Sequence, residues 1–388
     1  MKFAARMSRL GTETAFEVLA RARQLEACGK RIIHLEIGEP DFTTPKNIRD
    51  KACWALNNGY THYGPSAGLP EMREAIAKEI SKTRGIEVKP SQVVVTPGAK
   101  PIMFFVILAL ADSQDEVIYP NPGFPIYESV INFIGAEAVP IPLREENEFR
   151  LDLNELQELI NPKTRLLILN SPQNPTGGVL TYDDLKATAE MVLKYPDLYV
   201  LSDEIYSKTL YNGKHYSISS FPGMQERTII LDGFSKTFAM TGWRLGYGVM
   251  EESLATAVAR LQTNSNSCTA SFAQIAGIEA LTGDQSEVER MCTEFKRRRD
   301  VLIAGLNKIP RVKALLPNGA FYAFPNVSRI GWPSKKLADY LMDEAGVAVL
   351  SGTAFGKFGE GHLRLSYANS VENIKEALDK IDKALAKV

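Results

Sequence analysis

Cysteine and histidine are scarce in this sequence, and long apolar runs are missing. The 388 residues contain four of each, without a CxxC or HExxH spacing, so we expect reduced thiols and no metal site. The longest apolar run, residues 102–111, is far shorter than the ~20 residues of a membrane span. The N-terminus also lacks the apolar segment of a signal peptide. We therefore expect a cytoplasmic protein with no membrane partner.

An excess of either charge is missing as well. Lys and Arg number 45 against 46 Asp and Glu, which gives a formal net charge of −1. Binding to nucleic-acid phosphates needs a basic excess or a basic stripe. The densest cationic run, residues 296–299, falls in a helical pattern and is typical of a solvated helix face. We expect small-molecule substrates and no nucleic-acid partner.

Short apolar runs alternate with helical patterns between about residues 90 and 250. The runs are continuous rather than alternating, which is typical of strands covered on both faces. We expect strands over 93–96, 116–119, 166–170, 199–202 and 228–232, and helices over 100–111, 153–160 and 182–194. This pattern predicts an α/β fold with a mostly parallel, doubly wound sheet.

The two ends of the chain have a different pattern. We expect helices over residues 14–27 and 371–386, a long charged helix after residue 285, and short strands over 320–324 and 362–367. A chain of 388 residues is long enough for two or three domains. We predict a large α/β domain over residues 46–284 and a smaller α+β domain built from residues 1–45 and 285–388.

Chemically active residues follow the predicted strands. Ligands of open α/β sheets bind at the carboxyl ends of the strands. The segments at those ends are 97–100 (PGAK), 121–124 (NPGF), 171–177 (SPQNPTG), 203–206 (DEIY) and 233–236 (GFSK). One rim of the sheet therefore collects a glycine turn, an aromatic ring, an amide, a carboxylate with a phenol, and a lysine.

These groups suit a pyridine aldehyde that carries a phosphate. Lys236 would bind the aldehyde covalently and later act as an acid and base, while Asp203 would keep the ring nitrogen protonated. The backbone amides of Gly98 and Ala99, at the start of a helix, would hold the phosphate. Arg244 would add charge-assisted hydrogen bonds to it.

The segment 233–246, GFSKTFAMTGWRLG, resembles the pyridoxal-phosphate attachment signature of class I aminotransferases. NPTG at 174–177 and DEIY at 203–206 resemble two further hallmarks of that family, and HYGPSAGL at 62–69 and RLSY at 364–367 also match. The resemblance covers nearly the whole chain. It implies fold type I, a homodimer, pyridoxal 5'-phosphate as cofactor, and transfer of an amino group from an L-amino acid to a 2-oxo acid such as 2-oxoglutarate.

The resemblance also implies roles for single residues. Lys236 matches the lysine that attaches the cofactor, and Asp203 matches the partner of the ring nitrogen. Asn174 and Tyr206 match the residues that hydrogen-bond the phenolate oxygen, and Tyr206 would also serve catalysis. Phe124 occupies the stacking position.

The phosphate site shows one departure from the family pattern. Gly233 stands where some relatives place a phosphate-binding serine, so we expect Ser235 to serve instead. Tyr63 matches a residue that reaches the phosphate of the neighbouring subunit, which would place each site at a dimer interface. We also expect a cis bond between residues 174 and 175, because X–Pro bonds disfavour the cis form by only about 0.5–1 kcal/mol.

Arg364 would bind the substrate α-carboxylate, assisted by Asn174 and the backbone at Gly38. In bacterial-type aspartate aminotransferases a lysine at the position of Lys100 helps to hold an acidic side chain, which favours an aspartate-type substrate. Phe16 and the overall look of the chain also resemble aromatic aminotransferases. The alternatives are an aromatic or neutral amino acid as substrate, or a pyridoxal-phosphate-dependent C–S β-lyase. A non-catalytic regulatory module is disfavoured by the neutral charge.

Overall fold

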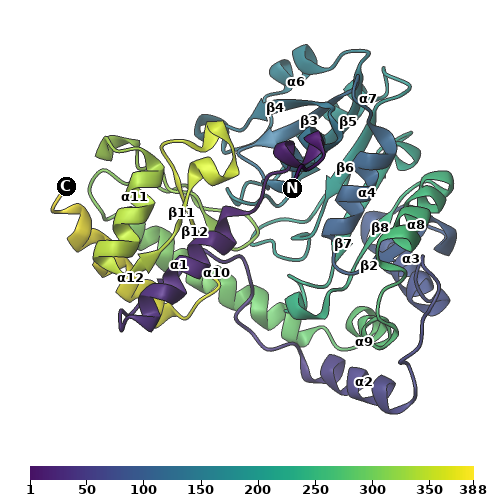
Figure 1. Cartoon of the computed structure of the whole chain (residues 1–388), viewed down its shortest axis with the longest axis horizontal. Coiled ribbons are helices and arrows are strands. Elements are labelled where there is room, and N and C mark those ends of the chain that lie inside the picture. Colours follow the sequence, from purple (N-terminus) through teal and green to yellow (C-terminus); the bar gives the residue numbers. More distant parts are fainter.

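A seven-stranded sheet forms the centre of the computed structural model, which describes residues 1–388 (Figure 1). The strand order is β2-β8-β7-β6-β5-β3-β4, and only β8 runs antiparallel to its neighbours. The strands are β2 (Val93–Thr96), β3 (Glu116–Asn121), β4 (Glu137–Pro142), β5 (Thr164–Asn170), β6 (Tyr199–Asp203), β7 (Thr228–Gly233) and β8 (Gly246–Val249). All five predicted strands are present, and the predicted mostly parallel α/β sheet is confirmed.

Helices cover both faces of this sheet, which explains why its strands are continuously apolar. Leu166 and Ile168 of β5 belong to a buried cluster with α4 (Lys100–Leu110), α5 (Ile126–Ile134) and α8 (Glu252–Asn266). Leu167 and Leu169 of the same strand belong to a cluster on the other face with α6 (Leu153–Leu159) and α7 (Tyr182–Val192). Successive side chains of a strand point to opposite faces, so both must be apolar here.

Local capping fixes where two of the predicted helices begin. The Asp152 carboxylate accepts hydrogen bonds from the Asn154 and Glu155 amides at the start of α6. At α7 the Thr181 hydroxyl accepts from the Asp184 amide at 3.1 Å, and the Asp184 carboxylate accepts from the Thr181 amide at 2.8 Å. Such reciprocal caps satisfy amides that have no partner inside the helix.

A third group of helices packs at the β2–β8 end of the sheet. Their apolar residues form one cluster with β2, β7 and β8. These helices are α2 (Lys46–Asn57), α3 (Pro70–Arg84) and α9 (Ser271–Thr282). None of the helices combines the length and the apolar character that crossing a bilayer requires.

Both ends of the chain meet in a smaller unit beside the sheet (Figure 1). β1 (Ile33–His34) pairs in parallel with β10 (Val347–Ala348), and β12 (Leu363–Ser366) lies between β11 (Leu350–Ser351) and β9 (Tyr322–Ala323) in an antiparallel sheet. The helices of this unit are α1 (Thr14–Ala27), α10 (Ser286–Leu306), α11 (Ser334–Tyr340) and α12 (Val371–Leu385). The predicted helix over 14–27 is confirmed, whereas the domain boundaries at 45/46 and 284/285 stay a prediction.

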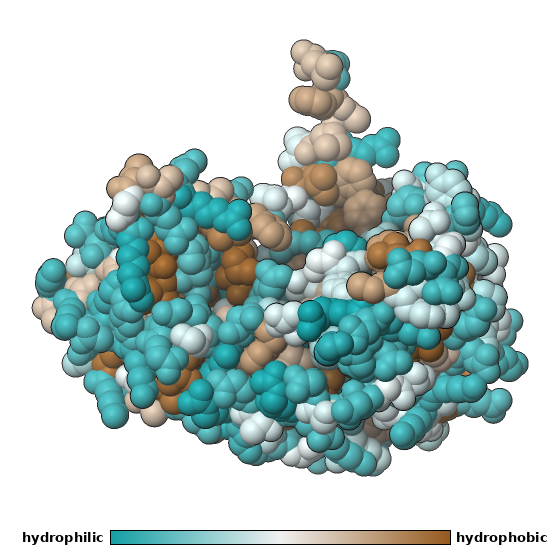
Figure 2. All heavy atoms as spheres, turned by 90° about the horizontal axis from the view of Figure 1, so that it is seen from below, coloured by the Kyte–Doolittle hydropathy of each residue, from teal (hydrophilic) through white to brown (hydrophobic).

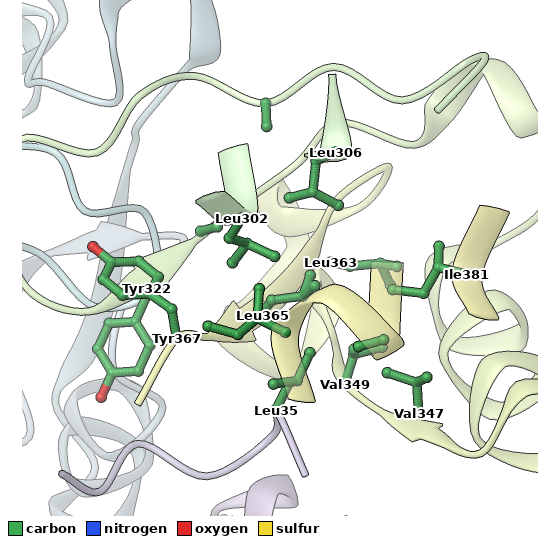
Figure 3. Packing of buried hydrophobic residues seen from close by; sticks show 14 of the residues in the cluster. Leu35, Leu302, Leu306, Tyr322, Val347, Val349, Leu363, Leu365, Tyr367 and Ile381 are labelled. Atoms are coloured by element: carbon green, nitrogen blue, oxygen red, sulfur yellow. The ribbon is translucent and has the colours of Figure 1, made fainter. Parts of the chain in front are cut away.

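One apolar cluster of 30 buried residues holds this smaller unit together. Figure 3 shows Leu35 near Leu365 and Val349, with Leu302 and Ile381 on surrounding helices. A residue near the start of the chain thus packs with residues from its last third. The residues before α1 lie against the large unit. There Arg9 of the 3-10 helix η1 (Ala5–Arg9) donates to the Asn132 and Phe133 carbonyls of α5.

A buried cluster of charges joins α3 to the ends of β6 and β7. The Arg84 guanidinium lies 2.7 Å from the Glu204 carboxylate and 3.0 Å from that of Asp232, and its side chain is 4% exposed. His215 is a further partner of Glu204, at 2.9 Å. Burial alone would raise the pKa of the Glu204 carboxyl, but Arg84 and His215 hold this pKa well below its usual range.

Arg84→Met should lower the free energy of unfolding by about 3–5 kcal/mol, because it removes the guanidinium that pairs with two buried carboxylates. Urea denaturation followed by circular dichroism at pH 8 measures the loss. Lys78→Met is the matched control, since Lys78 lies on the same helix in an exposed pair with Glu74 and should leave the stability nearly unchanged. Equal losses in the two variants would contradict this account of the cluster.

Candidate active site

A cavity of about 530 Å³ opens at the carboxyl ends of the strands, between the sheet and the smaller unit. Segments that follow five different strands reach it, together with residues from both chain ends. Most of the sequence-predicted site residues line this cavity: Gly38, Ala99, Lys100, Phe124, Asn174, Asp203, Tyr206, Ser235, Lys236, Arg244 and Arg364. Gly98 lies just outside the lining, and the Tyr63 side chain is 92% exposed elsewhere on the surface.

Lys236 follows the end of β7 and points into the cavity. Its Nζ donates a hydrogen bond to the Gly38 carbonyl at 2.5 Å. Loss of solvation lowers the pKa of this amine to about 8; Glu39 opposes the shift, and the Arg364 guanidinium adds to it. A neutral amine is therefore within reach near physiological pH, as a nucleophile or a base requires.

Asp203 is the last residue of β6, the strand next to β7 in the sheet. Its Oδ2 accepts a hydrogen bond from the Tyr127 hydroxyl at 2.6 Å, and its Oδ1 accepts from the Ile205 amide at 3.2 Å. Burial raises the pKa of the Asp203 carboxyl to about 6, against the effect of both hydrogen bonds. The carboxylate is thus ionised at pH 7 and strongly desolvated, so a cationic partner would bind it well.

Sequence reasoning missed Tyr127, which is fully buried on α5. Its ring continues the apolar face of that helix, so only the hydroxyl distinguishes it from an ordinary core residue. The contact with Asp203 joins residues 76 positions apart. No pattern in the sequence indicates such a pair.

Arg364 enters the cavity from β12, in the smaller unit. Its guanidinium donates to the Asn174 side-chain oxygen at 3.2 Å and to the Glu36 backbone carbonyl. It also lies 4.6 Å from the centre of the Tyr322 ring and 4.9 Å from that of Phe355. Its Nε is buried without a hydrogen-bond partner. A buried cation with an unused donor can bind a carboxylate.

Tyr322 organises this side of the cavity and was also missed. Its hydroxyl lies 2.7 Å from that of Tyr206. The backbone at Gly38 passes so close that a Cβ there would collide with the Tyr322 hydroxyl. Gly38 therefore allows the first segment of the chain to approach the cavity, where its carbonyl meets Lys236.

A tight turn forms the opposite end of the cavity, beside the start of α4. Gly98 adopts φ +87°, and a Cβ there would collide with the Arg244 guanidinium. A Cβ on Gly246 would likewise meet the backbone of Gly98 and Ala99. The Arg244 side chain also donates to the Thr241 carbonyl at 2.8 Å. Backbone amides at a helix start beside a guanidinium can bind a phosphate.

The close approach of β7 and β8 accounts for the departure at Gly233. A Cβ there would stand 3.0 Å from the Gly246 Cα and 3.3 Å from the Leu245 carbonyl oxygen. A serine at this position would need the neighbouring strand to shift by a few tenths of an ångström, whereas Ser235 already lines the cavity. The Asn174–Pro175 bond is cis as predicted, and the bonds at Asn121–Pro122 and Ser171–Pro172 are cis as well.

Lys100 begins α4 at the mouth of the cavity and forms an ion pair with Glu13. Its Nζ lies 5.4 Å from the centre of the Phe124 ring. Sequence reasoning missed Glu13, which also lines the cavity. The two residues are 87 positions apart, and no motif links them.

Comparison with known proteins places this architecture in a family. A family model described as aminotransferase class I and II matches residues 30–381. An aspartate aminotransferase of Pyrococcus horikoshii is 44% identical over 372 residues, which are 95% of this chain and 93% of the relative. An aromatic-amino-acid aminotransferase 2 of Thermococcus litoralis is 43% identical over 360 residues, which are 91% of this chain and 92% of the relative.

Solved structures agree with this assignment. An aspartate aminotransferase from Thermus thermophilus with maleate has a TM-score of 0.95 at 36% identity, and the match covers 99% of this chain and 100% of that one. The chain belongs to the class I and II aminotransferases, and is therefore an enzyme of the transaminase class. The resemblance drawn from the sequence motifs is confirmed.

The raised pKa of Asp203 predicts a pH-dependent cost to stability. An unfolded aspartate titrates near about 3.9, so between that pH and about 6 the folded protein binds more protons than the unfolded chain. Stability is therefore lost as the pH rises through 6. Asp203→Asn should raise the free energy of unfolding by about 2–3 kcal/mol at pH 8, and change it little near pH 4.

Denaturant titration at both pH values, on protein freed of small-molecule ligands, measures this difference. Asp379→Asn, an exchange at an exposed carboxylate, is the control and should leave the pH dependence unaltered. A stability gain of the same size at pH 4 and pH 8 would show that Asp203 is not the titrating group.

Proposed function

We propose that this protein is a pyridoxal-5'-phosphate-dependent aminotransferase that transfers the amino group of an L-amino acid, with an aspartate-type substrate favoured, to a 2-oxo acid such as 2-oxoglutarate. One observation carries the proposal. A lysine of lowered pKa and a buried carboxylate, at the ends of adjacent strands, line one cavity with a guanidinium that has an unused donor. Family membership supports the reaction class.

The donor set of the cavity fits the cofactor. The Asp203 carboxylate suits a protonated pyridine nitrogen, and the Phe124 ring provides a stacking surface. Asn174 and Tyr206 line the same cavity and can donate hydrogen bonds to a phenolate oxygen. When bound, pyridoxal phosphate would supply an electron sink for the α-carbon of the substrate.

The turn at the start of α4 fits the phosphate. The amides of Gly98 and Ala99, the hydroxyl of Ser235 and the guanidinium of Arg244 would hold it there. We assign a further contact to Tyr63 of the partner subunit, because Tyr63 of this chain is exposed and is not among the residues that line its own cavity. This assignment makes the phosphate site depend on a dimer.

Lys236 has two tasks in this proposal. It would hold the cofactor covalently before the substrate arrives. Its free amine would then act as the base that takes the proton from the substrate α-carbon, and a pKa of about 8 suits an amine that both accepts and gives up a proton near neutral pH. The Gly38 carbonyl orients the amine through the hydrogen bond at 2.5 Å.

Asp203 would face the pyridine nitrogen of the cofactor and favour its protonated form. The Tyr127 hydroxyl and the Ile205 amide fix the carboxylate by hydrogen bonds to both of its oxygens. Because the carboxylate is buried, its attraction for a nitrogen cation is little screened by water. Tyr127 acts here as a positioning residue.

Arg364 binds the α-carboxylate that all amino-acid substrates share, with Asn174 and the Gly38 backbone beside it. Lys100 supplies a cation for the second carboxylate of an aspartate-type substrate. Aromatic or neutral amino acids are the second candidate class, because Phe16, Phe124 and Phe355 line the same cavity. One relative carries each name: aspartate aminotransferase and aromatic-amino-acid aminotransferase.

The assembly we propose is a homodimer in the cytoplasm. Exposed aromatic and apolar side chains support a dimer contact: Trp54 and Leu56 of α2 are each 45% exposed, and Tyr63 is 92% exposed. The first ten residues are also exposed, and Figure 2 shows a mostly apolar segment that projects from the surface of the molecule. The four cysteines are unpaired, as in proteins of the reducing cytoplasm.

Lys236→Ala should abolish transamination and leave the cofactor bound only non-covalently. The wild-type protein, loaded with pyridoxal phosphate and reduced with borohydride, should carry the cofactor on the peptide that contains Lys236, as peptide mass spectrometry can determine. Lys214→Ala, at an exposed lysine, is the control and should keep both the label and the activity. A label on another lysine, together with full activity of Lys236→Ala, would refute the assignment.

A panel of amino donors with 2-oxoglutarate tests the substrate class. Aspartate should be the preferred donor, and preference for phenylalanine or tyrosine would favour the second candidate. Pyruvate and ammonia released from cystathionine without an acceptor would instead indicate a C–S β-lyase.

Arg364→Met should weaken binding of every donor by at least about 100-fold, because it leaves the shared α-carboxylate buried without a cation.

A further inference from the structure

The ion pair at the cavity mouth involves a carboxylate that does not cap its own helix. Glu13 is the N-cap residue of α1, yet its side chain accepts no hydrogen bond from the helix amides. The carboxylate points to Lys100 instead, and the Glu13 side chain is 17% exposed. The Glu13 carboxylate therefore pairs with Lys100 and not with the amides of its own helix.

The position of Lys100 in its helix means that a nearby anion stabilises its charge. It is the first residue of α4, where the helix dipole disfavours a cation, and the first turn of α4 contains no acidic residue. Glu13 supplies that negative charge from a segment 87 residues away. Lys100 is thus neutralised by the protein itself before any substrate binds.

The Glu13 carboxylate lies within electrostatic reach of the groups that would handle the substrate. It raises the pKa values of Lys236 and Arg364 against the dominant effect of burial. Both Glu13 and its neighbour Phe16 line the cavity. The N-terminal segment therefore brings a negative charge and an aromatic ring to the substrate side of the site.

We propose that Glu13 is a specificity-determining residue: its carboxylate occupies on Lys100 the place that the second carboxylate of a dicarboxylic substrate would take. This inference rests on the proposed aminotransferase function. A dicarboxylic substrate must displace the Glu13 carboxylate from Lys100. The second carboxylate of the substrate then lies close to the negative charge of Glu13. An aromatic or aliphatic side chain leaves the Glu13–Lys100 pair intact and packs against the rings of the same cavity. The pair thus lets one site accept both substrate classes while it weakens binding of the acidic one.

Binding of unreactive ligands to the holoenzyme tests this role without turnover. Succinate serves as the dicarboxylate and 3-phenylpropionate as the aromatic monocarboxylate, and isothermal calorimetry gives the Kd of each. Glu13→Gln should tighten succinate binding by about three- to ten-fold and leave 3-phenylpropionate within about two-fold. The KM for aspartate should fall in parallel, with the KM for phenylalanine unchanged.

Two further variants isolate the pair. Glu17→Gln removes the same charge from an exposed position on the same helix and should change neither Kd. In a Lys100→Met background, Glu13→Gln should tighten succinate binding much less than it does when Lys100 is present, because the two residues act mainly through one contact.

Several outcomes would overturn the inference. These are equal changes for both ligands in Glu13→Gln, weaker succinate binding in that variant, and an undiminished effect of Glu13→Gln when Lys100 is absent. Failure of the proposed function itself has a different signature: the wild-type protein would transaminate no donor, and neither carboxylate would bind. That result would overturn both proposals, whereas a working transaminase with an inert Glu13 would overturn this one alone.

Discussion

Desolvation of charged groups at the carboxyl ends of the strands is the constraint on which the rest of this structure depends. Burial raises the pKa of Asp203 to about 6 and lowers that of Lys236 to about 8, so one physical cause moves an acid and a base toward neutrality from opposite sides. The same burial leaves the guanidinium of Arg364 with an unused donor. Each of these groups destabilises the fold on its own. The apolar clusters on both faces of the sheet and in the smaller unit must offset that cost.

The fold holds these groups in place through contacts one layer behind them. Tyr127 fixes the orientation of Asp203 from α5, and the Arg84 cluster fixes the backbone just beyond it, where Glu204 is held. Glycine at positions 38 and 246 lets two other segments approach within contact distance of the cavity wall. The smaller unit contributes Arg364 and the Gly38 carbonyl, which come from opposite ends of the chain and are joined by a single apolar cluster. Rigid support of this kind lets a shifted pKa coexist with a defined geometry.

A feature of the fold or the site could be predicted from the sequence when it depends on residues close together in the chain. Strands buried on both faces carry their own signal as apolar runs, and the residues that follow them are then placed at one rim by topology alone. β4 and β8 gave no such signal, because β4 contains two prolines and β8 reads Gly-Tyr-Gly-Val, both poor strand sequences. Tyr127, Tyr322 and Glu13 were missed for a different reason. Each acts through a partner between 76 and 116 positions away, and a single sequence contains no record of such a contact.

The two cations that face the substrate differ in a way that bears on specificity. Arg364 is buried, lies close to two aromatic rings, and keeps a donor with no partner, which a substrate carboxylate would satisfy. Lys100 is more exposed and already carries a carboxylate partner from the chain itself. Binding at Arg364 therefore satisfies a group that the protein leaves unsatisfied, whereas binding at Lys100 exchanges one anion for another. Every amino acid can gain binding free energy from Arg364. Only a ligand that competes with Glu13 can gain binding free energy from Lys100. In this proposal the fold itself provides recognition of the shared α-carboxylate, whereas recognition of an acidic side chain depends on displacement of Glu13 from Lys100.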